Sequence, residues 1–427
     1  MTNPPLLRSV ARSLLKNFGN DMSKVYVVMP NRRACRFLKM ELADQADTAI
    51  LAPAARSIED FVVEMSGLEL IDRNKLLLEF YGVYKKVAHA KNITLGQFLK
   101  WASIFLNDID ELDLELVDVE TLFQNLVSIE RIRNWDPENG EVTDLQKNHL
   151  NHLKKFQAYY NALNSSLHTL GLAYRGMAYR KLAEQLQKGA ISKAISEVWF
   201  VGFNALYKSE EVIISALLEL EKAKIIWDTD QHYMNDNINE AGVFIRHNKL
   251  NPKFSDSFNN TGNGLNELQR TVEIVGVPGS VSQVKTAASI ISNIARKPNL
   301  DPIRTALVLN ESKLLQPMLN QLPEGDLTYN ITMGFPFRMS SLSQFVDQWL
   351  KIQIQIQERG KVHIRMLQGL LKQQVATQLL GAAHHRLVQA LKTNIHLTVD
   401  SIGKLTAGTT AAEQMFQPVN NPNEAID

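Results

Sequence analysis

The chain contains a single cysteine, Cys35, among its 427 residues. One cysteine excludes an internal disulfide framework and a cysteine-ligated metal cluster, and it indicates a reducing compartment. The sequence also lacks any run of about 18 apolar residues, the length that a membrane-spanning helix requires. Apolar residues make up 45% of the chain and charged residues 21%, which is typical of a globular protein. The length suffices for about two or three domains.

The N-terminus lacks the continuous apolar segment of a secretion signal. Apolar residues recur at helical spacing between Leu6 and Phe18, with Arg8, Arg12 and Lys16 between them. This pattern predicts an amphipathic helix and no signal peptide. We therefore expect a cytoplasmic protein. An organellar presequence is the alternative, because it would also be basic and amphipathic.

Phosphate-binding motifs are absent. A P-loop reads G-x-x-x-x-G-K-[ST], so that glycine N–H groups surround the phosphates and the lysine neutralises them. The nearest match, Gly171 to Met177, has Met177 in place of the lysine. Gly279 and Ser280 follow a predicted strand and precede a helix, but no lysine is adjacent. Either they bind an anion or they form a compact turn, and we favour the turn.

Carboxylates that could hold a nucleotide's magnesium ion are also scarce. The predicted strand Val198–Gly202 is followed by residues 203–206 without any acid. Asp228 and Asp230 end the next strand, and two acids there could hold a cation, although a hydrogen-bonded turn is the commoner explanation. No catalytic constellation is present, and we expect no bound cofactor or metal.

Charge is unevenly distributed although the formal net charge is only +1. Residues 1–42 contain eight Lys and Arg against two acids, and residues 359–404 contain seven against one, with four histidines. Residues 108–120 contain seven acids and no base, and we expect them to form a solvated helix end and loop. Basic ends suggest a local contact with a polyanion, whereas solvated helix faces are the commoner cause.

The segment VYVVMPNRRACRFLKMEL, residues 25–42, combines a strand, a turn and a basic helix. Val25–Met29 predicts a buried strand, which Pro30 and Asn31 end. The helix that follows carries four basic residues away from its apolar face: Arg32, Arg33, Arg36 and Lys39. A helix N-terminus with nearby arginines can bind phosphate or a nucleic-acid backbone. The alternative is an ordinary β-α unit with a solvated basic face. The helix start would lower the pKa of the Cys35 thiol, although a packed side chain is the default.

Helical periodicity from Arg73 to Gln187 predicts an all-helical insertion within an alternating series of strands and helices. The alternation predicts an α/β fold with a mainly parallel sheet covered on both faces. Helix N-caps are expected at Ser57, Ser209 and Ser340. The predicted strands are Val25–Met29, Thr48–Leu51, Val198–Gly202, Lys224–Asp228, Val272–Gly276, Thr305–Leu309 and Tyr329–Met333.

Several segments occur in an order that resembles the N-terminal part of AddB-type helicase–nuclease subunits, particularly the form found in Bacteroidetes-like bacteria. These segments are VYVVMPNRRACRFLKMEL, ILAPAARSIEDFV, VWFVGFNALYKSEEVIISALL, IIWDTDQHY, EAGVFIR, TALVLNESKLLQPMLNQLP and YNITMGFPF. The resemblance implies a superfamily-one helicase-like core with a large helical insertion. It divides the chain into 1–70 (first part of the α/β core), 71–190 (insertion), 191–270 (remainder of the core), 271–357 (partial second lobe) and 358–427 (start of a helical accessory domain).

The resemblance also implies a DNA contact. In such cores a Thr/Pro-Asn-basic turn touches the DNA backbone, and Pro30-Asn31-Arg32-Arg33 matches that pattern. The implied DNA-binding residues are Asn31, Arg32, Arg33 and Arg36. Residues 52–57 occupy the next DNA-facing turn, less convincingly.

Departures from the family limit the expected activity. The phosphate loop is absent, and Gly202-Phe203-Asn204 replaces the Asp-Glu pair of an active helicase. The PD-(D/E)XK nuclease domain and the iron–sulfur cysteines of the family have no counterpart, so we expect a fragment or truncated form. The resemblance implies a catalytically inactive DNA-binding scaffold in double-strand-break repair, with DNA (single-stranded or a duplex end) and an AddA-like subunit as partners. The alternatives are an NTP-dependent DNA-processing enzyme and a protein-interaction module without nucleic-acid binding.

Overall fold

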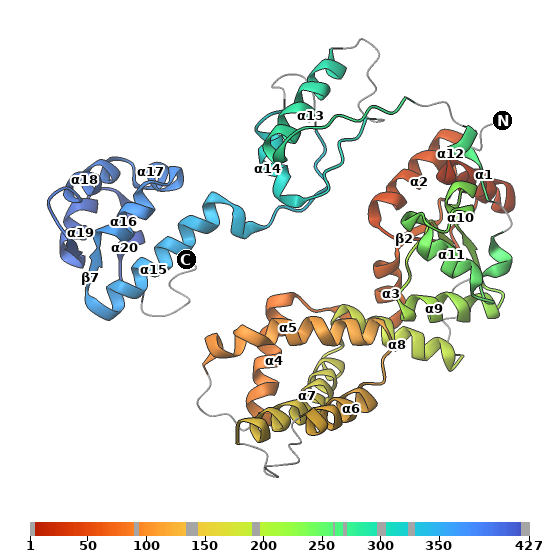
Figure 1. The fold of residues 1–427 in the computed structure, drawn as a ribbon, viewed down its shortest axis with the longest axis horizontal. Helices are drawn as coiled ribbons and strands as arrows, with labels where there is room; N and C mark the ends of the chain where they lie inside the picture. Colours follow the sequence, from red (N-terminus) through yellow and green to blue (C-terminus); the bar gives the residue numbers. More distant parts are fainter. Residues whose placement is uncertain are drawn as a thin grey trace. The chain divides into compact units, whose positions relative to one another are not determined.

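The computed structural model describes residues 5–88, 94–133, 144–189, 197–258, 261–267, 271–296, 305–322 and 329–419. The chain divides into two compact units, Met1–Thr271 and Val272–Asp427, and each is described by itself (Figure 1). None of the described helices is both long and apolar enough to cross a membrane.

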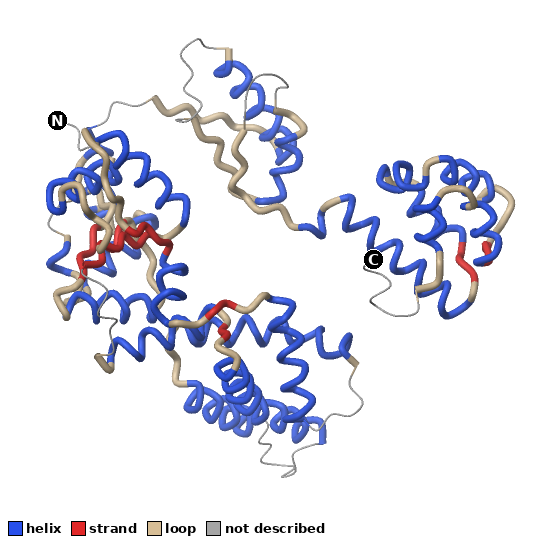
Figure 2. The backbone as a smooth tube through the Cα atoms, turned by 180° about the vertical axis from the view of Figure 1, so that it is seen from behind, coloured by secondary structure: helices blue, strands red, loops and turns tan. Residues whose placement is uncertain are grey.

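The first unit is built on a four-stranded parallel sheet, drawn in red in Figure 2. The strand order is β2-β1-β5-β6, with β1 at Val25–Met29, β2 at Ala54–Ser57, β5 at Glu197–Val201 and β6 at Ala223–Ile226. Val27 of β1 lies opposite Ala55 on one side and Trp199 on the other. The sheet confirms the predicted α/β class and its mainly parallel strands.

Helices cover both faces of this sheet. α1 (Leu6–Phe18) and α2 (Arg32–Gln45) pack on one face, where Val25, Val27 and Met29 of β1 point. Val28 points to the opposite face, where α3 (Ile58–Ser66), α8 (Arg175–Gln187) and α9 (Lys208–Glu219) pack. Because both faces are buried, β1 and the part of β5 after Glu197 are continuous apolar runs with no polar alternation.

The segment predicted as a helical insertion is mostly helical in the residues that the structure describes. It consists of α4 (Arg73–Ala88), α5 (Leu95–Leu114), α6 (Val119–Arg133) and α7 (Asp144–Thr169), which lead into α8. A two-stranded parallel ladder of β3 (Glu69–Leu70) and β4 (Leu172–Ala173) lies at its base. Its core is aromatic: Phe80 stacks on Phe105 with ring centroids 5.0 Å apart and meets Phe98 edge-on at 5.1 Å. The insertion shares one continuous apolar core with the α3–α8–α9 face of the sheet.

The end of the first unit is a series of short elements after β6. They are α10 (Gln231–Asn235), η1 (Glu240–Gly242), α11 (Val243–Leu250), η2 (Ser255–Ser257) and α12 (Gly264–Glu267). Trp227 anchors this segment, since its ring stacks on Phe258 at 4.9 Å and its Nε1–H donates to the Ser257 hydroxyl at 2.7 Å.

The second unit is helical in the described residues apart from one short ribbon. Its elements are α13 (Gly279–Ala295), η4 (Ser312–Leu314), α14 (Leu315–Leu319), η5 (Phe337–Met339), α15 (Ser341–Arg359), β7 (Lys361–His363), α16 (Ile364–Leu371), α17 (Gln374–Leu380), α18 (Ala382–Ala390), β8 (His396–Thr398), α19 (Val399–Thr406) and α20 (Thr410–Phe416). α15 to α20 enclose an apolar core of their own, and β7 pairs antiparallel with β8.

Several predicted strands are wrong. Residues 272–276, 305–309 and 329–333 belong to no strand among the described residues. Ile274 and Val308 of these segments are 91% and 86% exposed. Apolar β-branched side chains favour extended backbone, but a strand also needs a partner in register and a covered face. The predicted strand Thr48–Leu51 is also wrong: β2 starts at Ala54, and Leu51 makes only an isolated bridge to Asp21.

Two of the three predicted helix caps are confirmed. The hydroxyls of Ser57 and Ser340 accept the N–H of Asp60 at 3.2 Å and of Ser343 at 3.1 Å. The Ser209 cap is wrong, because α9 starts one residue earlier, at Lys208. Ser209 lies inside the first turn, and its buried hydroxyl has no hydrogen-bond partner in the described part of the chain.

Candidate nucleic-acid interface

The carboxyl ends of the four parallel strands meet at one edge of the sheet, and there the strand order reverses direction. The chain runs from β1 outward to β2, and later from β5 outward to β6 in the opposite direction. In open α/β sheets, ligands bind outside the carboxyl ends of the strands at such a switch point. A binding site is therefore expected at the loops after β1 and β5.

The loop after β1 is a two-residue turn that leads directly into α2. Asn31 has extended backbone, and its side-chain oxygen accepts the N–H of Ala34 at 2.9 Å. Asn31 is thus the N-cap of α2, a structural role that its place after Pro30 favours. The bond uses only the oxygen, so the amide nitrogen of Asn31 is the group that could donate to a phosphate.

Arg32 is held by an acid of the neighbouring helix. Its Nε and Nη2 donate to the two carboxylate oxygens of Asp60 at 2.9 and 2.5 Å, and Asp60 also accepts from the Ser57 hydroxyl at 2.6 Å. The Arg32 guanidinium, with the Ser57 hydroxyl, lowers the pKa of Asp60 to about 2. Arg32 therefore ties the start of α2 to the start of α3, and its charge is largely compensated.

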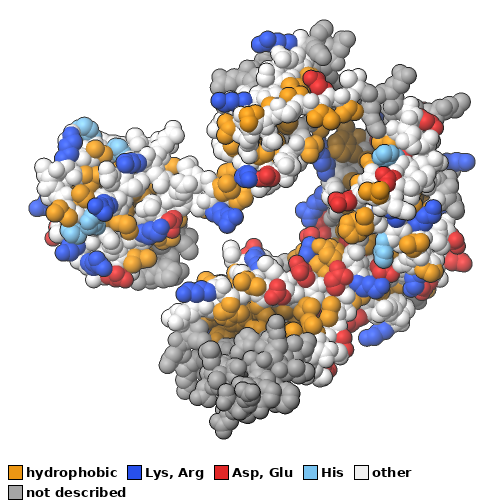
Figure 3. Space-filling model, viewed as in Figure 1, with side chains coloured by type: hydrophobic (Ala, Val, Ile, Leu, Met, Phe, Trp, Pro, Cys, Tyr) orange, Lys and Arg blue, Asp and Glu red, His pale blue; other side chains and the backbone are white. Residues whose placement is uncertain are grey.

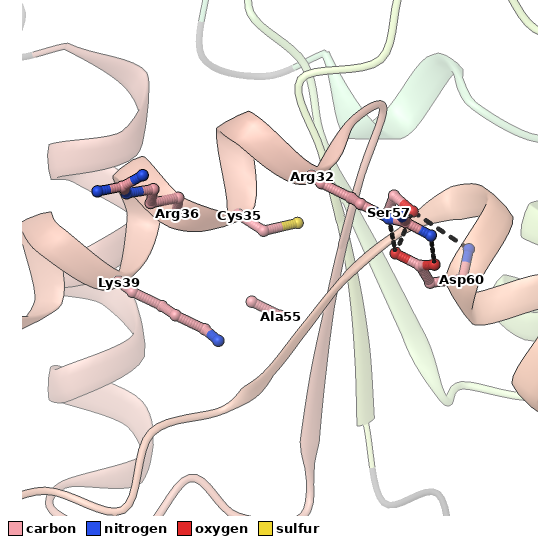
Figure 4. A pocket seen from close by; sticks show the side chains of 7 residues that line it. All are labelled: Arg32, Cys35, Arg36, Lys39, Ala55, Ser57 and Asp60. Carbon is pink, nitrogen blue, oxygen red and sulfur yellow. Dashed lines mark hydrogen bonds and ion pairs between the residues drawn. The ribbon is translucent and has the colours of Figure 1, made fainter. Parts of the chain in front are cut away.

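A shallow pocket of about 240 Å³ lies between α2 and the end of β2 (Figure 4). Seven residues line it: Arg32, Cys35, Arg36, Lys39, Ala55, Ser57 and Asp60. Figure 4 shows Arg32 directed toward Asp60 and Ser57, whereas Arg36 points away from that pair. Three cations and one acid line the pocket, and pairing Arg32 with Asp60 leaves two positive charges, Arg36 and Lys39.

Cys35 also lines the pocket, and its side chain is buried, in agreement with the prediction of a packed side chain. Its thiol donates to the carbonyl of Asn31 at 3.4 Å. Burial and the Asp60 carboxylate raise the pKa of the thiol, outweighing Lys39 and Arg56. The expected lowering of this pKa by the helix start is thus wrong, because Cys35 faces inward.

The cations on the outer face of α2 differ from Arg32 in their pairing. Arg33, Arg36 and Lys39 form no ion pair with any residue that the structure describes. The Arg33 guanidinium lies over the Phe37 ring, 5.6 Å from its centroid, which leaves its N–H groups open to solvent. Lys39 belongs to the basic pattern of the sequence but is not among the predicted site residues. Its position seven residues after Arg32, two helical turns along the same face, is the signal that indicates it.

Arg56, in the second predicted DNA-facing turn, is occupied by other contacts. Its Nε donates to Glu64 at 2.8 Å, and the Tyr26 hydroxyl donates to the same carboxylate at 2.7 Å. Arg56 and Ala55 are neighbours on β2, so their side chains point to opposite faces of the sheet. Only Ala55 and Ser57 of this turn reach the pocket.

The loop after β5 offers no charged group to a ligand. Gly202 has φ +73°, a conformation that glycine adopts without strain, and Phe203 is buried. The carbonyl of Asn204 accepts from the Asn248 side chain at 2.7 Å. A Leu6 methyl group lies 3.4 Å from where a side chain on Gly202 would begin. The start of α1 thus covers the end of β5, and the cations gather on the β1 and β2 side.

The acids after β6 act as turn-forming groups. One oxygen of Asp230 accepts the N–H of His232 at 2.9 Å, and the other accepts the N–H of Leu265 at 3.0 Å. Burial and the nearby Asp230 raise the pKa of Asp228. Among the described residues, no three His, Cys, Asp or Glu side chains gather as a metal site. Gly279 begins α13 in the second unit, with Pro278 at the cap position.

The expectation of a solvated acidic segment at residues 108–120 is wrong for two of its members. Asp113 is fully buried and accepts from the Tyr160 and Tyr174 hydroxyls at 2.6 and 2.5 Å. Asp110 accepts from the Arg175 guanidinium at 2.9 Å. These partners come from α7 and α8, more than 40 residues away in the chain.

No protein-family model and no curated protein matches this chain.

Proposed function

We propose that this chain is a catalytically inactive, helicase-like DNA-binding scaffold of a double-strand-break repair and recombination complex. The observation that carries the proposal is the outer face of α2 at the carboxyl edge of the parallel sheet. There Arg33, Arg36 and Lys39 form no ion pair with the described residues, and Arg36 and Lys39 line a pocket. The order of segments that resembles AddB-type subunits supports the same function.

The geometry favours a polymeric anion over a nucleotide. Arg33, Arg36 and Lys39 follow one another at intervals of three residues along α2, over about 9 Å. This length exceeds one phosphate and suits successive phosphates of a strand. The loop after β5 has no carboxylate for magnesium, and both oxygens of Asp230 already accept hydrogen bonds. The described residues of the site can therefore neutralise phosphates, and the one carboxylate that lines the pocket, Asp60, is already paired with Arg32.

The partners follow from this function. An AddA-like helicase–nuclease subunit would drive translocation in the cytoplasm while this chain holds the strand. A scaffold of this kind would bind single-stranded DNA or a duplex end through its backbone, without reading base sequence.

The test is a salt titration of single-stranded DNA binding by fluorescence anisotropy. The variant Arg33→Ala/Arg36→Ala/Lys39→Ala removes three phosphate contacts, so the slope of log K against log salt should fall by about 2. The matched control is Lys208→Ala/Lys224→Ala/Lys253→Ala, in which each lysine is paired with a glutamate in the parent. Equal binding by both variants at low salt would overturn the proposed site.

Two binding assays distinguish the rival functions. An NTP-dependent enzyme would show saturable binding of magnesium–ATP, which the scaffold function does not expect. A protein-interaction module would retain DNA weakly, with equal losses in the α2 variant and in the control.

A further inference from the structure

The β7–β8 ribbon of the second unit has one buried and one open face. Val362 and Leu397 lie opposite each other and are buried in the core of the α15–α20 bundle. Because side chains alternate along a strand, Lys361, His363 and His396 occupy the other face. The bundle core therefore fixes the ribbon and presents these three side chains outward.

The two histidines form a direct cross-strand pair. The rings of His363 and His396 meet edge to face with centroids 4.9 Å apart. Nδ1 of His363 accepts the N–H of Arg365 at 3.1 Å, so the neutral ring carries its proton on Nε2. That Nε2–H is a donor for an external acceptor.

The surroundings of this pair are cationic. Desolvation and the positive charges of Lys361, His363 and Arg359 lower the pKa of His396. Arg359, Lys361 and Arg365 are exposed, and none forms an ion pair within the described part of the chain. Asp400, on α19, is the one acid in residues 359–404. Lys351 of the same bundle, by contrast, is paired with Asp347.

We propose that the outer face of the β7–β8 ribbon is a second contact surface for a nucleic-acid backbone, formed by Arg359, Lys361, Arg365 and the His363–His396 pair. The inference rests on the proposed DNA-binding function and extends it to the second unit, where blue and pale-blue side chains are frequent on the bundle (left in Figure 3). Arginine, lysine and imidazole N–H groups suit phosphate oxygens, and exposed imidazole rings can stack on unpaired bases.

A membrane surface would require a different composition. Peripheral binding needs a broad apolar face beside the basic residues. Ile395, which precedes β8, is 68% exposed, but the apolar residues of the ribbon itself, Val362 and Leu397, are buried. The chemistry therefore favours a nucleic acid over a lipid headgroup layer.

The test uses the full chain and a fluorescent oligothymidylate at about 50 mM salt. Arg359→Gln/Lys361→Gln should weaken binding several-fold and lower the salt slope by about 1.4, the value for two single-strand phosphates. His363→Gln/His396→Gln should weaken binding at pH 6 more than at pH 8. The matched control is Lys313→Gln/Lys351→Gln, which removes two lysines that are paired with Glu311 and Asp347.

The outcomes separate this inference from the proposed function. If the parent fails to bind DNA, both fail. If the α2 triple variant weakens binding while the ribbon variants match the control, only the ribbon surface is overturned. The ribbon surface would also be overturned if the ribbon variants lost binding to phosphatidylserine vesicles but kept the parent's affinity for DNA. Circular dichroism confirms that each variant is folded, and Lys361→Arg should retain parent affinity.

Discussion

At the scale of single residues, Asp113 organises the polar interior of the helical insertion. Its carboxylate accepts from Tyr160, Tyr174 and the Nε of Arg180, the last at 2.6 Å. Asp113→Asn leaves the partly buried guanidinium without its counter-charge, and we expect a loss of about 3–5 kcal/mol in the free energy of unfolding. Urea denaturation followed by circular dichroism measures it.

An acid of the same segment provides the control. Asp118 precedes α6 and accepts the N–H of Thr121 at 3.2 Å in an exposed position. Asparagine caps a helix about as well as aspartate, so Asp118→Asn should change stability by less than about 0.5 kcal/mol. A similar loss in both variants would contradict the central role of Asp113.

Glu210 gives a prediction about pH. It is 6% exposed, and burial raises the pKa of its carboxyl from 4.5 to about 7. Between these values the folded chain binds more protons than the unfolded chain, so the free energy of unfolding falls as pH rises from about 4.5 to 7. The total is about 3 kcal/mol. Glu210→Gln keeps a side-chain oxygen that can accept the Tyr207 N–H. The variant should remove this pH dependence of the free energy of unfolding, and it should be more stable than the parent at pH 8.

Comparison of urea midpoints at pH 5 and pH 8 checks this prediction. Glu219, which is exposed and at the far end of α9, provides the control Glu219→Gln, whose pH dependence should parallel that of the parent. The same pH dependence in the Glu210 variant and the parent would show that Glu210 is not the source.

At the scale of elements, the start of α2 depends on the Asn31 cap. Asn31→Ala removes the acceptor for the Ala34 N–H and should cost about 1 kcal/mol. Asn31→Asp retains the cap, and its charge suits the helix N-terminus. If Asn31→Asp weakens DNA binding while its Tm equals or exceeds that of the parent, a phosphate lies near Asn31, because the variant removes the amide donor and adds a negative charge without losing the cap.

The contact between α5 and α8 requires a glycine. A Cβ on Gly176 would lie 2.2 Å from the Asp110 carbonyl oxygen and 2.9 Å from the Asp113 Cβ. Gly176→Ala must push the two helices apart, and we expect a loss of at least about 2 kcal/mol. Gly82→Ala is the matched control, because a Cβ there meets nothing within 4 Å, and alanine should stabilise α4 by about 0.5–1 kcal/mol. Thermal unfolding of both variants distinguishes them.

Local patterns predicted elements well where packing agreed with propensity. Val25–Met29 is a strand because both its faces are covered, and Ser57 and Ser340 cap helices because their hydroxyls reach the third N–H. Ile274 and Val308 have equal strand propensity but no strand, since pairing depends on distant segments. The sequence likewise predicted Arg32 at the site but could not show that Asp60 neutralises it.

At the scale of the whole molecule, each of the two units has apolar cores of its own. Among the residues that the structure describes, each cluster of buried apolar residues has all its members within Met1–Thr271 or within Val272–Asp427. We therefore expect a fragment of residues 1–271 to fold alone, with cooperative unfolding and a Tm close to that of the first transition of the full chain. A non-cooperative transition in that fragment would contradict this.

Helical periodicity predicted the helices between Arg73 and Gln187 well, because the 3.6-residue pattern persists over more than 100 residues there. The basic character of the ends was visible in composition alone. Composition does not predict which acids are buried, because Asp110 and Asp113 contact partners from helices far along the chain. The seven acids of residues 108–120 therefore predict a solvated segment from the sequence alone, and only the tertiary packing shows which of them are buried.

The central strand β1 pairs with β5, and between Met29 and Glu197 the chain passes through the whole helical insertion. On the ribosome, at roughly 5–20 residues per second, the second partner of β1 is synthesised about 10–30 s after β1 itself. During this interval the backbone N–H and C=O groups along one edge of β1 are unpaired, while the insertion, whose residues all precede Glu197, can already fold. A holdase chaperone that binds extended apolar segments would therefore act on the nascent chain before residue 197, and slower translation through the insertion would lengthen that dependence.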